Sequence, residues 1–280
     1  MFTKTIFILS TATALTLLNT MCRKKAVTVQ ITPVPSIAVT LIADGPGDTY
    51  ELINSKLAPG FDVVESPDCV HPAFGRHIAE VWDTQLNSYV FEFYSHVTPD
   101  NDRCVAFDRQ RTEIKTYDKS PANLIGTVGE TITYKWRFRM APGFQPSSNF
   151  THIHQVKPVN GDDGTPIFTL TARKGSPDKM ELIHDNTTKV AIVDLSQFTG
   201  VWVEATEVIK VGASGTYSMI IKRISDGATI LSYSNNNIMT IRPTNDFIRP
   251  KWGIYRSLNS PGDLRDDSIR FNAFSIEEHK

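Results

Sequence analysis

The chain has 280 residues, of which 40% are hydrophobic and 10% aromatic, with 16 glycines and 16 prolines. This size and composition predict one globular domain with a substantial core. Its 29 Lys and Arg nearly balance its 30 Asp and Glu, for a formal net charge of -1. That balance argues against a global field that recruits nucleic acid or a membrane surface. An acidic ligand would have to be held by a local group of cations.

The first 22 residues have the pattern of a secretory leader. Lys4 precedes an apolar run at 6–18 that is too short to span a bilayer as a helix. Cys22 leaves a second interpretation open, a lipid-anchored protein, although Asn19 stands where such a signal usually has Leu. We therefore expect a secreted protein without a membrane span.

A tether is predicted to follow at 23–43, where Pro33 and Pro35 interrupt a stretch of high β propensity. The turn that begins with Asp44 is predicted to open the folded domain, which would run from 44 to 280.

Cys69 and Cys104 are the two cysteines beyond the leader. In an exported chain such a pair is most simply a disulfide. A catalytic cysteine is the weaker alternative, because neither residue stands in a nucleophile signature.

The rest of the chain predicts short strands with turn signals between them and a single short helix at 51–57. Even spacing of strands without long helices favours a β-sandwich, and 202–233 has the pattern of an antiparallel meander. The clearest strands are predicted at 89–97, 109–116, 131–140, 152–157, 167–173, 201–209, 216–224, 251–256 and 268–276.

Three of these strands carry polar residues with a period of two, which places those residues on one face. They read RQRTEIK at 109–115, HIHQVK at 152–157 and KWGIYRS at 251–257. Taken alone, the strand at 109–115 is better explained as a solvated strand, and a core or rim aromatic is the alternative for Tyr255. Their occurrence together, in this order, favours a functional face.

In these strands the sequence resembles the jelly-roll alginate lyases. The signature strands of that family read Arg-Ser/Thr-Glu-Leu-Arg, then Gln-Ile/Val-His, then Tyr-Phe-Lys-Ala-Gly-Ile/Val-Tyr-Asn-Gln. Here RTEIK at 111–115 matches the first, QVK at 155–157 the second with Lys in place of His, and KWGIY at 251–255 the core of the third. The wider sequence, including 151–157 and 249–256, is similar to the glucuronan lyases. The resemblance implies an all-β, concanavalin-like jelly-roll β-sandwich with an open concave cleft and no required cofactor.

The resemblance also implies roles for individual residues. Arg111 and Gln155 would engage a substrate carboxylate, and Tyr255 would act as the acid and as a candidate base. The fourth group is left open between two registers. With Gln155 on the family's Gln, Lys157 replaces the histidine; with 152–154 on Gln-Ile-His, the base is His154 and His152 binds the carboxylate. A slip of one residue moves the set to the opposite face.

We favour the register that places Gln155 and Lys157 in the cleft and keep His154 as a catalytic candidate. These groups suit β-elimination from a uronate, which needs cations and donors to neutralise the carboxylate, a base for the C5 proton and an acid for O4. The predicted substrate-binding residues are Lys157, Glu113, Lys115, Arg173, Lys251 and Arg256.

The leading hypothesis is therefore an endo-acting, monomeric polysaccharide lyase that cleaves an acidic, uronate-containing polysaccharide such as glucuronan or alginate. The alternative is a non-catalytic carbohydrate-binding module or lectin for acidic glycans, because one fold serves both purposes. A glycoside hydrolase ranks last, since Glu204 and Glu207 fall on opposite faces of their strand.

No metal site is predicted. His152 and His154 stand two residues apart but have no third ligand at an obvious spacing. The loops at 160–164 and 263–267 are rich in oxygen ligands, yet ordinary turn chemistry explains their Asn, Asp and Gly. A structural Ca²⁺ is left open but not favoured.

Overall fold

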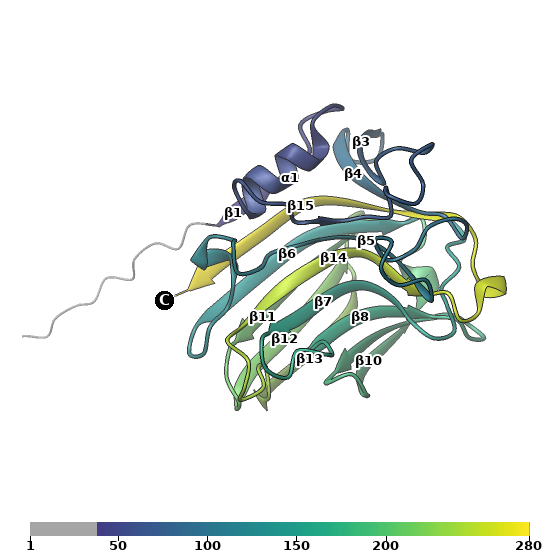
Figure 1. Cartoon of the computed structure of the whole chain (residues 1–280). Coiled ribbons are helices and arrows are strands. Elements are labelled where there is room, and N and C mark those ends of the chain that lie inside the picture. Colours follow the sequence, from purple (N-terminus) through teal and green to yellow (C-terminus); the bar gives the residue numbers. More distant parts are fainter. Residues whose placement is uncertain (1–37, 280) are drawn as a thin grey trace, which may run out of the picture. The chain divides into compact units, whose positions relative to one another are not determined.

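The computed structural model describes residues 38–279, which form two antiparallel sheets packed face to face (Figure 1). The first, eight-stranded sheet has the order β13-β12-β11-β6-β15-β4-β3, and β1 pairs with β15. Its strands are β1 (Val39–Leu41), β3 (Ile78–Asp83), β4 (Ser88–Ser95), β6 (Thr131–Met140), β11 (Val203–Lys210), β12 (Gly215–Arg223), β13 (Thr229–Ile238) and β15 (Asp267–His279).

The second, seven-stranded sheet has the order β10-β9-β8-β7-β14-β5-β2. Its strands are β2 (Val64–Glu65), β5 (Arg109–Lys115), β7 (Thr151–Val159), β8 (Phe168–Arg173), β9 (Lys179–His184), β10 (Thr188–Asp194) and β14 (Phe247–Ser257). The helix α1 (Thr49–Leu57) and the short helices η1 (Ala122–Leu124), η2 (Leu195–Gln197) and η3 (Pro261–Asp263) lie in connections. The predicted all-β jelly-roll sandwich is thus confirmed.

The core lies between the two sheets. The eight-stranded sheet contributes fully buried aromatic side chains such as Trp136 and Phe271, and the seven-stranded sheet contributes Trp252 and Ile254. Period-two alternation places these side chains inward, so the polar residues between them face outward. The meander of β11, β12 and β13 has the predicted antiparallel pairing.

The folded body begins earlier than predicted. Val39, assigned to the tether, pairs with Ile276 as part of β1. The β propensity of this stretch is realised as a short strand that pairs with β15. The leader, Cys22 and the tether up to residue 37 lie outside the described residues. None of the helices in 38–279 is long and apolar enough to cross a membrane.

Several strands had no clear sequence signal. β1 and β2 are only three and two residues long, and β10 has seven residues of which none is fully buried. Such strands lack a regular apolar period. The strands predicted from the sequence, by contrast, all form, and they are distributed over both sheets.

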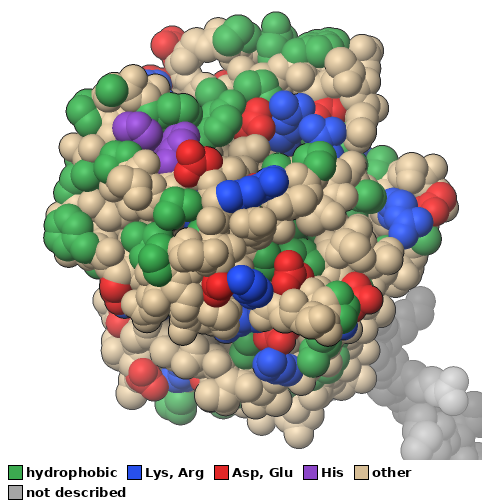
Figure 2. Space-filling model, turned by 90° about the vertical axis from the view of Figure 1, so that its right-hand side faces the viewer, with side chains coloured by type: hydrophobic (Ala, Val, Ile, Leu, Met, Phe, Trp, Pro, Cys, Tyr) green, Lys and Arg blue, Asp and Glu red, His purple; other side chains and the backbone are tan. Residues whose placement is uncertain are grey.

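Opposite charges are interspersed over the surface. On the face shown in Figure 2, Lys and Arg side chains lie among Asp and Glu side chains. Lys135, Arg137 and Arg139 alternate along β6 on the outer side of the eight-stranded sheet, where Arg137 pairs with Glu204 at 2.8 Å. This row therefore lies on the opposite side of the sandwich from the cleft described below.

Candidate active site

Three adjacent strands, β5, β14 and β7, bring the predicted site residues together on the outer face of the seven-stranded sheet. Tyr255 on β14 lies opposite Arg111 on β5 and opposite His152 on β7. Lys251 lies opposite Gln155 in the same way. Positions far apart in the chain thus share one face, where they line a cleft of about 250 Å³.

An irregularity in β7 decides which histidine reaches this cleft. The pairing with β8 and β14 shifts between His152 and His154, with Ile153 as the extra residue opposite β8. Ile153 and His154 are consecutive residues that both lie in the interior. The side chain of His152, directly before them, therefore faces the cleft instead of the core. Gln155 and Lys157 also line the cleft, as the favoured register places them. The structure thus combines parts of the two registers that the sequence left open.

His154 does not lie in the cleft, contrary to its selection as a catalytic candidate. It is fully buried between the sheets, where its Nε2 lies 2.8 Å from Glu207 and its Nδ1 lies 3.0 Å from the backbone oxygen of Lys251. Tyr217 donates a 2.7 Å hydrogen bond to the other oxygen of Glu207. His154 therefore belongs to a buried polar group that joins the two sheets.

Arg256 is also misplaced by the sequence prediction. It follows Tyr255 directly and so points to the other face, where it is fully buried and its Nε donates to Gln110 at 2.6 Å. Burial lowers the pKa of its guanidinium to about 10. Arg256 cannot contact a ligand in the cleft.

Tyr255 is held by two arginines of β5. The Nη1 of Arg109 donates a 2.9 Å hydrogen bond to the Tyr255 hydroxyl oxygen, and the Arg111 guanidinium carbon lies 3.7 Å from the centre of the ring. Because the oxygen accepts from Arg109, the phenol keeps its own proton to donate elsewhere. Two guanidinium groups thus fix the position of the phenol, one at its oxygen and one on its ring.

Below the cleft, two carboxylates balance part of the positive charge. Fully buried Glu113 contacts Lys251 at 2.8 Å and Arg111 at 2.5 Å, and Gln155 donates to it at 2.6 Å. Burial opposes ionisation of Glu113, but the Lys251 and Arg111 cations outweigh it and hold its pKa low. Glu65 on β2 is held low in the same way.

Glu113 was predicted to bind substrate, but it is fully buried and cannot meet a ligand itself; it positions its neighbours. Lys251, which is also buried, pairs with Glu65 and Glu113 and lines the cleft floor. Lys115 pairs with Glu65 at 2.8 Å. Their charges are largely compensated within the site.

Lys157 and Arg249 are the cations whose charge is least compensated. Lys157 bonds to the backbone oxygen of Asp163, and burial together with neighbouring cations, Lys251 first, lowers its pKa to about 8. Arg249 lies opposite Lys157, and its buried Nε and Nη1 have no hydrogen-bond partner within residues 38–279. Unpaired donors of this kind are suited to an anion.

His152 is the second residue with an unused polar atom. Its buried Nδ1 has no hydrogen-bond partner in the described part of the chain, and its ring centre lies 5.7 Å from that of Tyr255. Burial, followed by the Arg173 cation, lowers its pKa to about 3. The imidazole is therefore neutral at pH 7 and can exchange a hydrogen bond with a ligand.

Gly253 allows the floor of the site to form. Its φ of +146° is one that L side chains rarely adopt, and a Cβ there would overlap the carbonyl oxygen of Thr112 on β5. It lies opposite Glu113, so the space beside it is left to the side chains of Lys251 and Tyr255.

The groove continues beyond the cleft. Asn186 lines both the cleft and a neighbouring hollow of about 370 Å³ over β8, β9 and β10. This hollow includes Arg173, one of the predicted substrate-binding residues, which lies 3.8 Å from Glu181. Lys174, Lys179 and Lys189 also line it. An anionic chain longer than one sugar could therefore meet cations along its length.

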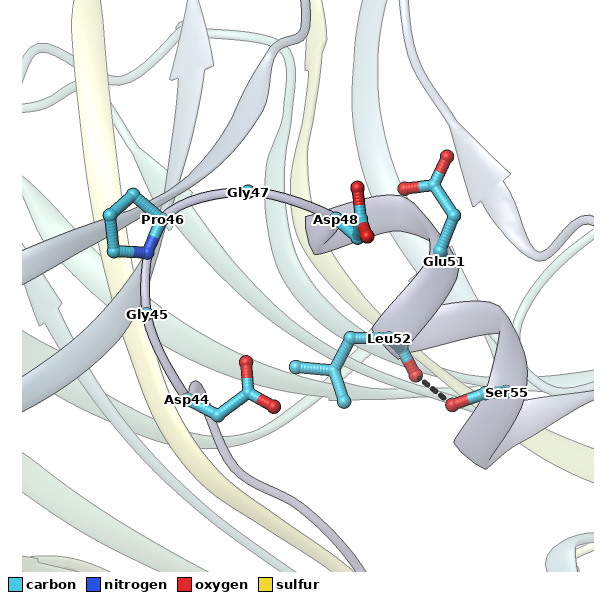
Figure 3. A pocket seen from close by; sticks show the side chains of 8 residues that line it. All are labelled: Asp44, Gly45, Pro46, Gly47, Asp48, Glu51, Leu52 and Ser55. Atoms are coloured by element: carbon cyan, nitrogen blue, oxygen red, sulfur yellow. Dashed lines mark hydrogen bonds between the residues drawn. The ribbon is translucent and has the colours of Figure 1, made fainter.

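Another hollow, of about 470 Å³, lies at the start of α1 (Figure 3). Asp44, Asp48 and Glu51 line it, and Ser55 there donates to the backbone oxygen of Leu52 at 2.8 Å. Its acidic lining disfavours an acidic ligand.

Three signals in the sequence were missed. Arg109 opens the quoted strand at 109–115, and Arg249 stands two residues before the quoted strand at 251–257. Extending the period-two pattern of Arg111 and of Lys251 by one step toward the N-terminus would have found both. His152 was placed only through the alternative register, because a bulge is not visible in a residue pattern.

Comparison with solved structures agrees with the architecture. The alginate lyase AlgAT5 of polysaccharide lyase family 7 aligns with a TM-score of 0.51 and 12% identity, covering 78% of this chain and 94% of that one. The family 7 alginate lyase A1-II', in complex with the substrate GGMG, aligns with a TM-score of 0.50 and 15% identity, covering 80% and 97%. The fold is that of the jelly-roll polysaccharide lyases.

A third structure with this arrangement is the endo-beta-1,4-glucuronan lyase of the fungus Trichoderma reesei. It aligns with a TM-score of 0.48 and 16% identity, covering 71% of this chain and 85% of that one. No protein-family model matches the sequence, and no curated protein is similar to it. The alignments with TM-scores of 0.50 and 0.51 show the fold alone.

Proposed function

We propose that the protein is an endo-acting polysaccharide lyase that cleaves a uronate-containing polysaccharide, such as glucuronan or alginate, by β-elimination. One observation carries the proposal: the Tyr255 hydroxyl is held by Arg109 at 2.9 Å in a cleft that is also lined by Lys157, which bonds to a backbone oxygen rather than to a carboxylate. Proton transfer and neutralisation of a carboxylate are the two requirements of this reaction.

Binding of the substrate carboxylate is assigned to Lys157, Arg249 and Gln155. Lys157 and Arg249 have little compensation of their charge. Gln155 and Lys157 line the cleft, and Arg249 lies opposite Lys157 on β14. Arg111 was expected to bind this carboxylate, but its Nε and Nη2 already donate to Asp102 and its Nη1 to Glu113. We therefore give Arg111 the role of positioning Tyr255.

Proton transfer is assigned to Tyr255. As the phenolate it would take the proton from C5; the C5 electron pair would form the C4–C5 double bond and expel O4, which would recover the proton from the phenol. Arg109 donates to the hydroxyl oxygen that would exchange the proton, and Arg111 packs on the ring. His152, a weak base because of its low pKa, would bind the substrate as a neutral hydrogen-bond partner.

The charge state of the buried carboxylates argues against a glycoside hydrolase. Such an enzyme needs one carboxyl group with a raised pKa as its acid. In the cleft region, the pKa values of Glu65 and Glu113 are both lowered by neighbouring cations. Glu207 lies in the core and Glu204 on the outer side of the other sheet.

Export from the cell is part of the proposal. Cys69 and Cys104 form the disulfide that the sequence predicts. Disulfides persist chiefly in oxidising, extracytoplasmic compartments, where a large polysaccharide substrate would also be met.

The test is to mix the protein with glucuronan, alginate and an uncharged glucan separately and to follow the ultraviolet absorbance of the unsaturated uronate. We expect absorbance to rise with one polyuronate and not with the glucan. The rise should fall by about 100-fold or more in Tyr255→Phe and persist in Tyr89→Phe, which alters a tyrosine of β4 outside the cleft. Binding of an acidic glycan without any absorbance change would support a binding module instead.

A further inference from the structure

A cluster of three histidines and one aspartate lies outside the cleft. His71, His77, His96 and Asp100 each offer one ligand atom, and these atoms all lie within 4.8 Å of one another. No other group of three or more His, Cys, Asp or Glu with this geometry occurs within residues 38–279. Histidine side chains reach the surface together on the face shown in Figure 2.

Asp100 stands at the centre of the cluster. Its Oδ1 lies 2.9 Å from Nδ1 of His71 and 3.2 Å from Nε2 of His77, and its Oδ2 lies 3.1 Å from Nδ1 of His96. The Asp100 side chain is fully buried and the two outer histidines are partly exposed. Three imidazole nitrogens thus converge on a single buried carboxylate.

An outer carboxylate orients the innermost histidine. Nδ1 of His77 lies 2.7 Å from Asp68, which leaves its Nε2 directed at the cluster. Tyr50 donates to Asp68 at 2.9 Å and so holds that carboxylate in place. A carboxylate on the far nitrogen of a histidine is the usual support of a metal-bound imidazole, because it fixes the tautomer and raises the basicity of the ligand.

We propose that this cluster binds one divalent transition-metal ion, with Zn²⁺ as the best match. Three nitrogen ligands and one carboxylate oxygen satisfy tetrahedral zinc, whereas Ca²⁺ and Mg²⁺ require oxygen ligands. Four protein ligands close the coordination sphere, and Phe74 packs over it with its ring centre 4.3 Å from that of His96. The site is therefore structural rather than catalytic.

The ion would connect the loop between β2 and β3 to the loop between β4 and β5. His71 lies in the segment between β2 and β3, and Asp100 lies in the loop between β4 and β5. Cys69 and Cys104 already link the same two segments. Two residues after Asp100, Asp102 accepts bonds of 2.8 and 3.0 Å from Arg111. The metal would thus stabilise the support of the arginine that packs on Tyr255.

No sequence motif points to this site, because its four ligands have no regular spacing and come from two separate connections, β2–β3 and β4–β5. The oxygen-rich loops at 160–164 and 263–267 gather no comparable group in the described part of the chain. The site requires neither a substrate nor lyase activity, so its test is independent of the proposed function.

The test uses the full chain without a histidine tag, stripped with a chelator and titrated with Co²⁺ or Zn²⁺. We expect one ion per chain by mass spectrometry, visible absorption bands of tetrahedral Co²⁺, and a melting temperature about 5 °C higher with saturating Zn²⁺. Ca²⁺ should leave the melting temperature unchanged.

Two ligand variants and one control decide the outcome. His71→Ala and His96→Ala change partly exposed ligands and should lose the ion, with folding verified by circular dichroism. His279→Ala removes a histidine that is 40% exposed at the end of β15 and should retain it. The proposal is overturned if the unaltered chain takes up no ion, or if the folded His71→Ala and His96→Ala chains bind as much metal as His279→Ala.

Discussion

Arg109 donates a 2.9 Å hydrogen bond to the hydroxyl of Tyr255 across 146 positions of the chain. The contact exists because β5 and β14 are neighbours in the seven-stranded sheet, with Ser257 opposite Arg109 and Tyr255 opposite Arg111. Asp108 holds the other side of the Arg109 guanidinium at 2.7 Å. The orientation of the phenol is therefore set by a residue that the lyase signature does not include.

Replacing Arg109 tests this relationship. Arg109→Ala should lower kcat by about 10- to 100-fold, because a hydrogen bond to a charged group contributes roughly 1.5–3 kcal/mol. KM should change less, since Arg109 acts on Tyr255. Arg137→Ala, which removes a half-exposed arginine from the other sheet, serves as the control for lost charge. Equal kcat values in the two variants would exclude a role for Arg109.

The two histidines of β7 should give opposite results. His152→Ala should reduce turnover with little change in melting temperature, because its Nδ1 makes no hydrogen bond within residues 38–279. His154→Ala takes away one of the two partners of buried Glu207, which keeps its bond to Tyr217, and should cost about 3 kcal/mol of stability. Thermal melting and steady-state rates, measured on both variants, separate the effects. A stable but inactive His154→Ala protein would contradict the placement of His154 in the core.

Lys157 should give binding a pH dependence. Its pKa of about 8 lies below the ordinary value of a lysine, so it is charged below pH 8 and loses its charge as the pH rises. KM for a polyuronate should therefore increase about fivefold between pH 7 and 9. This factor corresponds to the loss of one ion pair that contributes about 1 kcal/mol to binding. In Lys157→Arg the charge persists and this rise should disappear. A profile with the same rise in both proteins would assign the titration to another group.

Gly253→Ala should damage the site through the backbone. The added methyl group would overlap the Thr112 carbonyl, and the alanine would have to adopt a φ of +146°. The two effects together should lower the free energy of unfolding by at least about 2 kcal/mol. Gly262→Ala, where nothing lies within 4 Å of the added Cβ, should stay within about 0.5 kcal/mol of the unaltered chain. Urea unfolding of both variants measures the difference, and equal midpoints would show that β5 and β14 tolerate a side chain there.

Much of the architecture could be read from the sequence. Period-two alternation in strands such as 131–140 and 251–256 separates a core face from a polar face by geometry alone, and those strands form as predicted. The disulfide followed from there being two cysteines beyond the predicted leader. These features depend on local pattern or on simple counting.

The tertiary structure decided which polar residues act together. The bulge at Ile153 brings His152 into the cleft and sends His154 to the core, because one extra residue reverses every later side chain of a strand. The ion pairs that occupy Arg111, and the convergence of His71, His77 and Asp100, arise between segments that only the packing of loops and strands brings together. A linear sequence specifies the period of each strand; the register between strands, set by the closed packing of the two sheets, determines the site.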